Sequence, residues 1–123
     1  MVMFDANMIL RYLLDDNEEM AQRAEDYLNA GDVFVTTEVI AEVVYVLNGV
    51  YSLERGKIVD ALKRFLRLVD YQEAEVVNLA VETYGGKGLD FVDCILYAYH
   101  QIKGIEIATF DKKLMKLLSE ERR

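Results

Sequence analysis

Short apolar runs alternate along this chain with longer segments of helical periodicity, and this alternation constrains the fold more than any other feature. The runs that we expect to form strands are Val2–Phe4, Val33–Val35, Leu68–Tyr71 and Ile105–Phe110. The segments that we expect to form helices are Asn7–Leu14, Asn17–Ala30, Thr37–Tyr51, Ser52–Leu68, Glu73–Tyr84, Asp90–Lys103 and Lys112–Glu121. Strands that alternate with helices predict an α/β fold. We expect a three-layer α/β/α sandwich around a mainly parallel sheet of four or five strands, with helices on both faces.

Several helix ends are marked by single residues. Asn17 is placed to cap the second helix, because its side-chain oxygen accepts a hydrogen bond from a free backbone N–H group. Glycine after a helix adopts the left-handed conformation at no steric cost. We therefore expect helices to end at Gly31, at Gly85-Gly86 and at Gly104.

The composition is that of a folded, acidic chain. Its 123 residues favour one domain over residues 1–123, and a hydrophobic fraction of 53% is enough for one ordinary core. Cys94 and His100 are single residues of their kinds, which excludes a disulfide framework, a thiolate zinc cluster and a multi-histidine metal site within one chain. The net charge of −8 excludes a generally basic nucleic-acid binder, although cations or a partner could mask some acids.

The sequence carries no visible signal for a membrane or for export. No run approaches the roughly 20 apolar residues of a membrane-spanning helix. The opening MVMFDANMIL is interrupted by Asp5 and lacks a basic start or a small-residue cleavage site. We therefore expect a cytoplasmic protein that does not contact a membrane.

One acid lies in the middle of an apolar helix. Glu42 is the only charged residue in VIAEVVYVL, and a helix that is apolar on nearly every side is usually buried. An ionised glutamate in such a place must be paired, hydrated or bound to a metal, because bare burial costs at least several kcal/mol. A salt bridge or a gap open to solvent explains Glu42 slightly better than a metal does.

Two further acids lie one helical turn apart, at Asp90 and Asp93. The favoured interpretation of Asp90 is a helix cap. Asp93 is harder to explain in this way, because it lies between Val92 and Cys94 in an otherwise apolar run.

Asp5 and Asp111 each follow a predicted strand and precede a predicted helix. Each could be a helix cap, but the carboxyl ends of parallel strands share one edge, where such folds bind ligands. Clustered carboxylates repel one another unless a cation neutralises them, and an all-oxygen site suits Mg²⁺ or Mn²⁺. Such ions activate water and stabilise charge in phosphodiester cleavage.

Three segments together resemble the motif pattern of one family. FDANMILRYLLDD places Asp5 at the end of the first strand and Asn7 two positions later. TTEVIAEVVYVL contains Glu42, and DFVDCILYAYHQIKGIEIATFDKKL contains Asp93 and Asp111. In order and spacing these segments resemble PIN-domain ribonucleases, and more narrowly VapC-type toxins of toxin–antitoxin pairs. The chain departs from many relatives in ending on an expected helix, so its sheet would have one strand fewer.

The resemblance implies a single PIN-like domain that cleaves single-stranded RNA and leaves a 5′ phosphate. It implies that Mg²⁺ or Mn²⁺ is held by four catalytic acids, Asp5, Glu42, Asp93 and Asp111. It also implies a homodimer and an antitoxin partner that inserts a basic side chain among these acids. The apolar faces that contain Ile9, Tyr12, Leu13, Val44 and Leu47 are candidates for the dimer interface.

Auxiliary roles follow from the same resemblance. Asn7 and Thr109 would orient carboxylates or metal-bound water, and Asp90 would assist through a water molecule. We assign Arg11 to the surface or to a partner contact, and we expect His100 on the surface.

Lysines near the expected site are candidate RNA contacts. Lys112, Lys113 and Lys116 follow Asp111 closely enough to steer a phosphate backbone, although a solvated face would explain them as well. Lys87 lies in the GGKG segment, which we interpret as a flexible loop and not as a nucleotide-binding loop, because no Ser or Thr follows. We name Lys87, Lys112 and Lys113 as the possible contacts.

Two other classes of protein remain open. A PIN-like scaffold that binds proteins without catalysis would have lost or paired one of the acids, and all four positions carry acids here. A phosphatase-type enzyme or a signalling receiver would use an acid cluster differently. A phosphatase would need an Asp-x-Asp pair, and Asn7 stands at the second position.

Overall fold

The computed structural model describes residues 1–120 and divides after Gln72 into two compact units. The first unit contains β1 (Val2–Met3), α1 (Ala6–Leu14), α2 (Glu18–Ala30), β2 (Val33–Val35), α3 (Thr37–Gly49), α4 (Arg55–Leu66) and β3 (Asp70–Tyr71). The second unit contains α5 (Ala74–Lys87), α6 (Phe91–Lys103) and α7 (Lys112–Glu120). The α/β composition is as expected, and the single domain over residues 1–123 stays a prediction.

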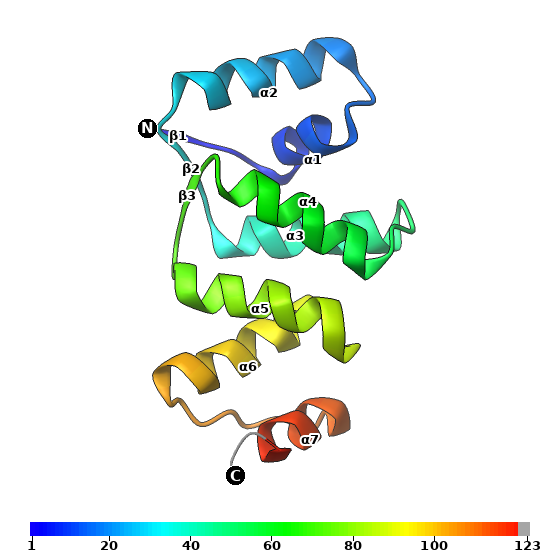
Figure 1. The fold of residues 1–123 in the computed structure, drawn as a ribbon, viewed down its shortest axis with the longest axis vertical. Coiled ribbons are helices and arrows are strands. Elements are labelled where there is room, and N and C mark those ends of the chain that lie inside the picture. The colour runs from blue at the N-terminus through cyan, green and yellow to red at the C-terminus, as the bar shows by residue number, and fades with distance from the viewer. Residues whose placement is uncertain (121–123) are drawn as a thin grey trace. The chain divides into compact units, whose positions relative to one another are not determined.

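The first unit is built on a parallel sheet with the strand order β1-β2-β3. Val2 pairs with Val33, and Phe34 pairs with Asp70. Because each strand neighbours the next in sequence, right-handed crossovers place both helix pairs on one face. Figure 1 shows the three strands together at one side of this unit. Within this unit the sheet therefore has one covered face, and the three-layer sandwich stays a prediction.

The sheet has three strands in the described residues, and the expectation of four or five was wrong. The missing strand is Ile105–Phe110, which forms neither a strand nor a helix. A strand needs a hydrogen-bonded neighbour, and residues 73–120 contain no other strand. The segment instead begins by turning back onto α6, where the carbonyl of Ile105 accepts a hydrogen bond from His100 Nδ1 at 2.8 Å. Strand-forming residues alone did not decide the local structure here.

Side-chain caps mark the starts of two helices, and glycines mark the ends of two. Asn17 accepts a hydrogen bond from Met20 N at 3.0 Å and caps α2, as expected. Thr36 caps α3 in the same way through Val39 N at 3.3 Å. At the other ends, Gly31 and Gly104 follow α2 and α6 with φ of 81° and 67°, which confirms both expected stops.

Some other helix ends differ from the expectation, and one cannot be compared with it. The helix expected from Ser52 begins only at Arg55, because Ser52 itself is left-handed with φ of 54° and cannot belong to a right-handed helix. The preceding helix ends at Gly49 and not at Tyr51. The last helix runs to Glu120, and the expected final residue, Glu121, lies outside the described residues.

The GGKG segment is not a loop as a whole. α5 continues through Gly85 and Gly86 to Lys87 and ends at Gly88, whose φ is 69°. Each glycine inside a helix costs about 1 kcal/mol relative to alanine. Packing offsets this cost, because α5 lies against α6 and the Tyr84 ring meets the Phe91 ring edge-on at 5.9 Å. The expected stop at Gly85-Gly86 was therefore wrong.

Alanine substitutions at two glycines of the second unit should change stability in opposite directions. At Gly104 the φ of 67° strains any L side chain, so Gly104→Ala should lower the free energy of unfolding by about 1–2 kcal/mol. Gly86 is helical and has open space at its Cβ position, so Gly86→Ala should raise it by about 0.5–1 kcal/mol. Urea unfolding of the full chain measures both changes. Destabilisation by Gly86→Ala would show that α5 does not continue through this residue.

The buried side chains come from the faces of helices and from the central strand. In the first unit Val33 and Val35 of β2 are buried, together with Ile9, Ile40 and Phe65 from the helices. In the second unit α6 packs against both α5 and α7, and the buried set includes Val77, Ala80, Cys94, Ala98 and Leu114. Among residues 1–120, no helix is long and apolar enough to cross a membrane.

Candidate active site

Asp5 and Asp111 both cap helices. Asp5 Oδ1 accepts a hydrogen bond from Met8 N at 2.9 Å at the start of α1. Asp111 Oδ1 accepts one from Leu114 N at 2.8 Å at the start of α7. The cap interpretation is thus confirmed for both residues. Each cap uses one carboxylate oxygen, so the second oxygen of each side chain stays available to another ligand.

Thr109 prepares the turn that presents Asp111. Its hydroxyl oxygen accepts a hydrogen bond from Asp111 N at 3.0 Å, and this bond holds the backbone at the residue whose carboxylate is expected to act. Thr109 therefore contacts the acid that it was expected to orient. Asn7 is exposed in the first turn of α1, and its orienting role stays a prediction.

In the second unit, the charges of two carboxylates act on a third. Asp90 occupies the N-cap position of α6, but its side chain makes no cap hydrogen bond, so the favoured cap interpretation was wrong for this side chain. Asp93 is half-buried one turn further along. Burial, and then the negative charges of Asp111 and Asp90, raise the pKa of the Asp93 carboxyl above its ordinary value. The ionised form of Asp93 is therefore disfavoured in this environment.

Glu42 is exposed on α3, so the helix is not buried on every side as its apolar sequence suggested, and the favoured alternative of a gap open to solvent fits Glu42. The helix buries Ile40, Val43, Val44 and Leu47 on one side. Its other side carries Glu42 and also Tyr45, which is 76% exposed. The apolar residue on the open side made the helix look apolar all round, although only one face is covered. The Glu42 carboxylate is therefore hydrated, as the alternative of a solvent gap allowed.

Arg11 makes structural contacts within the first unit, and its assignment to the surface or to a partner contact stays a prediction. Its side chain is only 17% exposed. Its Nη1 donates to both Asp16 carboxylate oxygens at 2.7 and 2.8 Å, and its Nη2 donates to the Tyr51 hydroxyl at 3.2 Å. Arg11 thus ties the segment between α1 and α2 to the chain that follows α3. His100 is likewise half-buried and bound to Ile105, and not a free surface residue.

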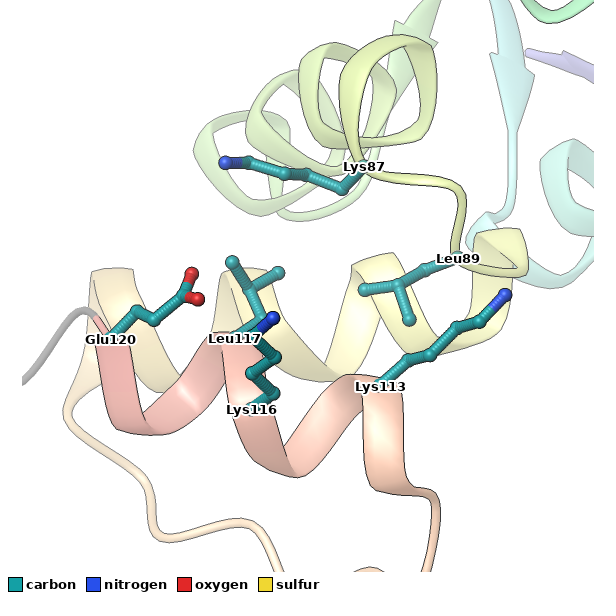
Figure 2. Close-up of a pocket in the computed structure, with 6 residues that line it drawn as sticks. All are labelled: Lys87, Leu89, Lys113, Lys116, Leu117 and Glu120. Carbon is teal, nitrogen blue, oxygen red and sulfur yellow. The ribbon is translucent and has the colours of Figure 1, made fainter.

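Lysines gather in one hollow of the second unit. Figure 2 shows Lys87 at the end of α5, on one side of the hollow, and Lys113 and Lys116 on α7, on the other side. Of the expected contacts, Lys87 and Lys113 line this hollow together with Lys116, and Lys112 does not, so a contact of Lys112 with RNA stays a prediction. Helical periodicity could have predicted this lining, because positions 113, 116, 117 and 120 share one face of α7.

The four expected catalytic acids are divided between the two units. Asp93 and Asp111, with Asp90, lie together in the second, and Asp5 and Glu42 belong to the first. No group of three or more His, Cys, Asp or Glu side chains within residues 1–120 is arranged to hold a metal ion. That all four acids meet at one site stays a prediction.

The chain combines a parallel α/β unit with carboxylates at the starts of α1, α6 and α7. This combination defines a class of α/β proteins with acids at helix N-termini. A family model described as the PIN domain matches residues 2–118. The chain therefore belongs to the PIN domain family, as its motifs indicated.

Among curated proteins the chain is similar to a VapC ribonuclease of Aquifex aeolicus (strain VF5). The two sequences are 27% identical over 124 residues, which cover 95% of this chain and 92% of the relative. No solved structure gives a significant match.

Proposed function

We propose that this chain is a divalent-metal-dependent endoribonuclease that cleaves single-stranded RNA, and that it is the toxin of a toxin–antitoxin pair. The observation that carries the proposal is the group Asp90, Asp93 and Asp111, in which neighbouring negative charges add to burial in raising the pKa of Asp93. Structural carboxylates are seldom placed so that they repel one another, and functional sites often contain such groups. The full-length similarity to a VapC ribonuclease supports both the activity and the toxin role.

The residues fit a hard divalent cation in their chemistry. The donor set is made of carboxylate oxygens, without histidine or thiolate, and this set suits Mg²⁺ or Mn²⁺. A cation between Asp93 and Asp111 would relieve the repulsion that raises the pKa of Asp93. In this proposal Asp5, Glu42, Asp93 and Asp111 hold the metal, which supplies water activation and neutralises charge that develops on the phosphodiester.

The chain prepares these carboxylates in different ways. The caps of α1 and α7 hold Asp5 and Asp111 by one oxygen each, so their side chains are ordered before any ligand arrives. Asp93 acts as its anion, and its raised pKa means that it loses its proton at a higher pH than an ordinary aspartate. Glu42 is exposed, so its carboxylate is accessible to a ligand.

The partners that we propose are an antitoxin protein and a second copy of the chain. Of the residues that we considered for the dimer interface, Ile9, Val44 and Leu47 are at most 2% exposed and belong to the chain's own core, whereas Tyr12 and Leu13 are half-buried. An interface on this side can therefore use only Tyr12 and Leu13 of the five. Sedimentation of the purified chain alone, and with a candidate antitoxin, measures both associations.

Removal of divalent cations should abolish RNA cleavage. Incubated with a single-stranded RNA, the full chain should produce fragments with 5′ phosphates in Mn²⁺ or Mg²⁺, and the rate should fall at least about a hundredfold in EDTA. Excess Mn²⁺ should restore it, which separates metal removal from irreversible damage. Double-stranded RNA and single-stranded DNA are the substrate controls. Equal cleavage with and without metal would contradict the proposed mechanism, and no cleavage with any metal would favour the scaffold alternative.

A further inference from the structure

The second unit has a hollow whose lining is unusual for an acidic chain. Its volume is about 300 Å³, and three lysines line it although the chain carries a net charge of −8. The lining residues are Lys87, Leu89, Lys113, Lys116, Leu117 and Glu120. We call this hollow the lysine pocket. Figure 2 shows that the lysines come from two helices, so the positive charge is gathered by the fold and not by one charged run.

The lysine pocket is close in the chain to the carboxylates of the same unit. Leu89 lines the pocket and directly precedes Asp90 in the chain. Lys113 lines it from α7 and follows Asp111 by two residues. Since successive Cα atoms are about 3.8 Å apart, the backbone that lines the pocket is at most about 8 Å from the backbone of Asp90 and of Asp111. This separation is within the reach of neighbouring phosphates of one extended RNA strand.

We propose that the lysine pocket binds a phosphate group of the RNA backbone adjacent to the phosphodiester that is cleaved. This inference rests on the proposed function for the identity of the polymer. Lysine ammonium groups bind phosphate as point charges and do not read base edges. No aromatic side chain lines the pocket, so it offers no surface on which a base could stack. The pocket therefore contributes affinity and register along the strand, and no base preference.

Glu120 provides a second prediction of opposite sign, because it places a carboxylate in the same lining. A negative charge there opposes a bound phosphate and should weaken its binding. Removing this charge should therefore strengthen RNA binding, whereas removing any of the three lysines should weaken it. Opposite responses from residues of one pocket are not expected if the lysines act only through the overall charge of the chain.

The test is RNA binding by the full chain in EDTA, which prevents metal-dependent cleavage. Anisotropy of a labelled single-stranded RNA gives Kd between about 50 and 200 mM salt, where each phosphate contact contributes about 0.7 to the slope of log K against log salt. The triple variant Lys87→Gln, Lys113→Gln, Lys116→Gln removes the contact to one phosphate, so it should lose about 0.7 from this slope and bind at least about tenfold more weakly at low salt. Glu120→Gln should bind more tightly than the wild type.

The matched control is Lys57→Gln, which removes the same charge from an exposed position of α4, outside the pocket. It should keep the wild-type slope, and an effect equal to that of Lys113→Gln would overturn the proposal. Inorganic phosphate should compete with RNA for the wild type and not for the triple variant, and single-stranded DNA should bind with the same lysine dependence. If the triple variant binds RNA as the wild type does while the wild type cleaves RNA with metal, the proposed phosphate site is wrong and the proposed nuclease activity stands. If binding depends on the lysines but no metal supports cleavage, the phosphate site stands and the nuclease activity is wrong.

Discussion

Asp93→Asn should lower the rate of RNA cleavage at least about a hundredfold and should at the same time make the folded chain more stable at neutral pH. The loss of activity follows because the variant removes a proposed metal ligand, and even residues that only support metal ligands are worth about 10–100-fold. The gain in stability follows because the amide carries no charge to be repelled by Asp111 and Asp90 or to be desolvated.

The pH dependence of this gain has a definite sign. The pKa of Asp93 is raised in the folded state, so the folded chain binds a proton more tightly than the unfolded chain does. Between the ordinary Asp pKa of about 3.9 and the raised value, stability therefore falls as the pH rises. Asp93→Asn should be more stable than the wild type above this window and should show no advantage below it.

Thermal unfolding at pH 3 and pH 7, together with a cleavage assay in Mn²⁺, measures both effects. Glu106→Gln is the control, because Glu106 is an exposed acid of the same unit, and this variant should keep wild-type activity and melting temperature. A destabilised Asp93→Asn at pH 7 would show that Asp93 makes a favourable structural contact and would remove the main support for the site. A stabilised but fully active variant would remove Asp93 from the catalytic acids.

The second large effect concerns acids that are both helix caps and proposed metal ligands. Asparagine caps a helix as well as aspartate does, but it carries no negative charge. Asp5→Asn and Asp111→Asn should therefore lower RNA cleavage at least about a hundredfold with little change in stability. Asp5→Ala and Asp111→Ala should lose the same activity and also about 0.5–2 kcal/mol in the free energy of unfolding.

Cleavage assays in Mn²⁺ and urea unfolding of the four variants separate the two roles. If the asparagine variants remain active, the carboxylates serve only as caps and do not bind metal. Glu42 allows the same test without a cap, because it is exposed on α3. Glu42→Gln should lose activity at unchanged stability, while Glu38→Gln, one turn earlier on that helix, should retain both. Loss of activity in variants of acids from both units would support a shared site for all four acids.

Local signals predicted much of the first unit. Asn17 and Gly31 marked the ends of α2 correctly, and Val33–Val35 was predicted at its observed bounds. These features depend on a capping oxygen or on a glycine with positive φ. The hydrogen bonds involved join residues within one helical turn of each other, so a local sequence is enough to predict them. The acids at helix starts were found for the same reason, since Asp5 and Asp111 follow apolar runs that can be read directly.

Several features that the sequence did not predict depend on contacts between different segments of the chain. Ile105–Phe110 has the residues of a strand, but residues 73–120 offer no other strand, and the carbonyl of Ile105 is bound to His100 instead. The burial of Arg11 depends on Tyr51, and the continuation of α5 past Gly86 depends on its packing against α6.

The sequence by itself determined the approximate place of each helix, the caps formed by Asp5, Asn17 and Asp111, and that acids stand at positions suited to binding a hard cation. Only the tertiary structure decided that Glu42 faces solvent, that Asp93 is crowded by Asp111 and Asp90, and that Lys116 rather than Lys112 lines the lysine pocket. Caps and periodicity act over three or four residues, whereas burial and charge repulsion depend on which surfaces the folded chain brings together.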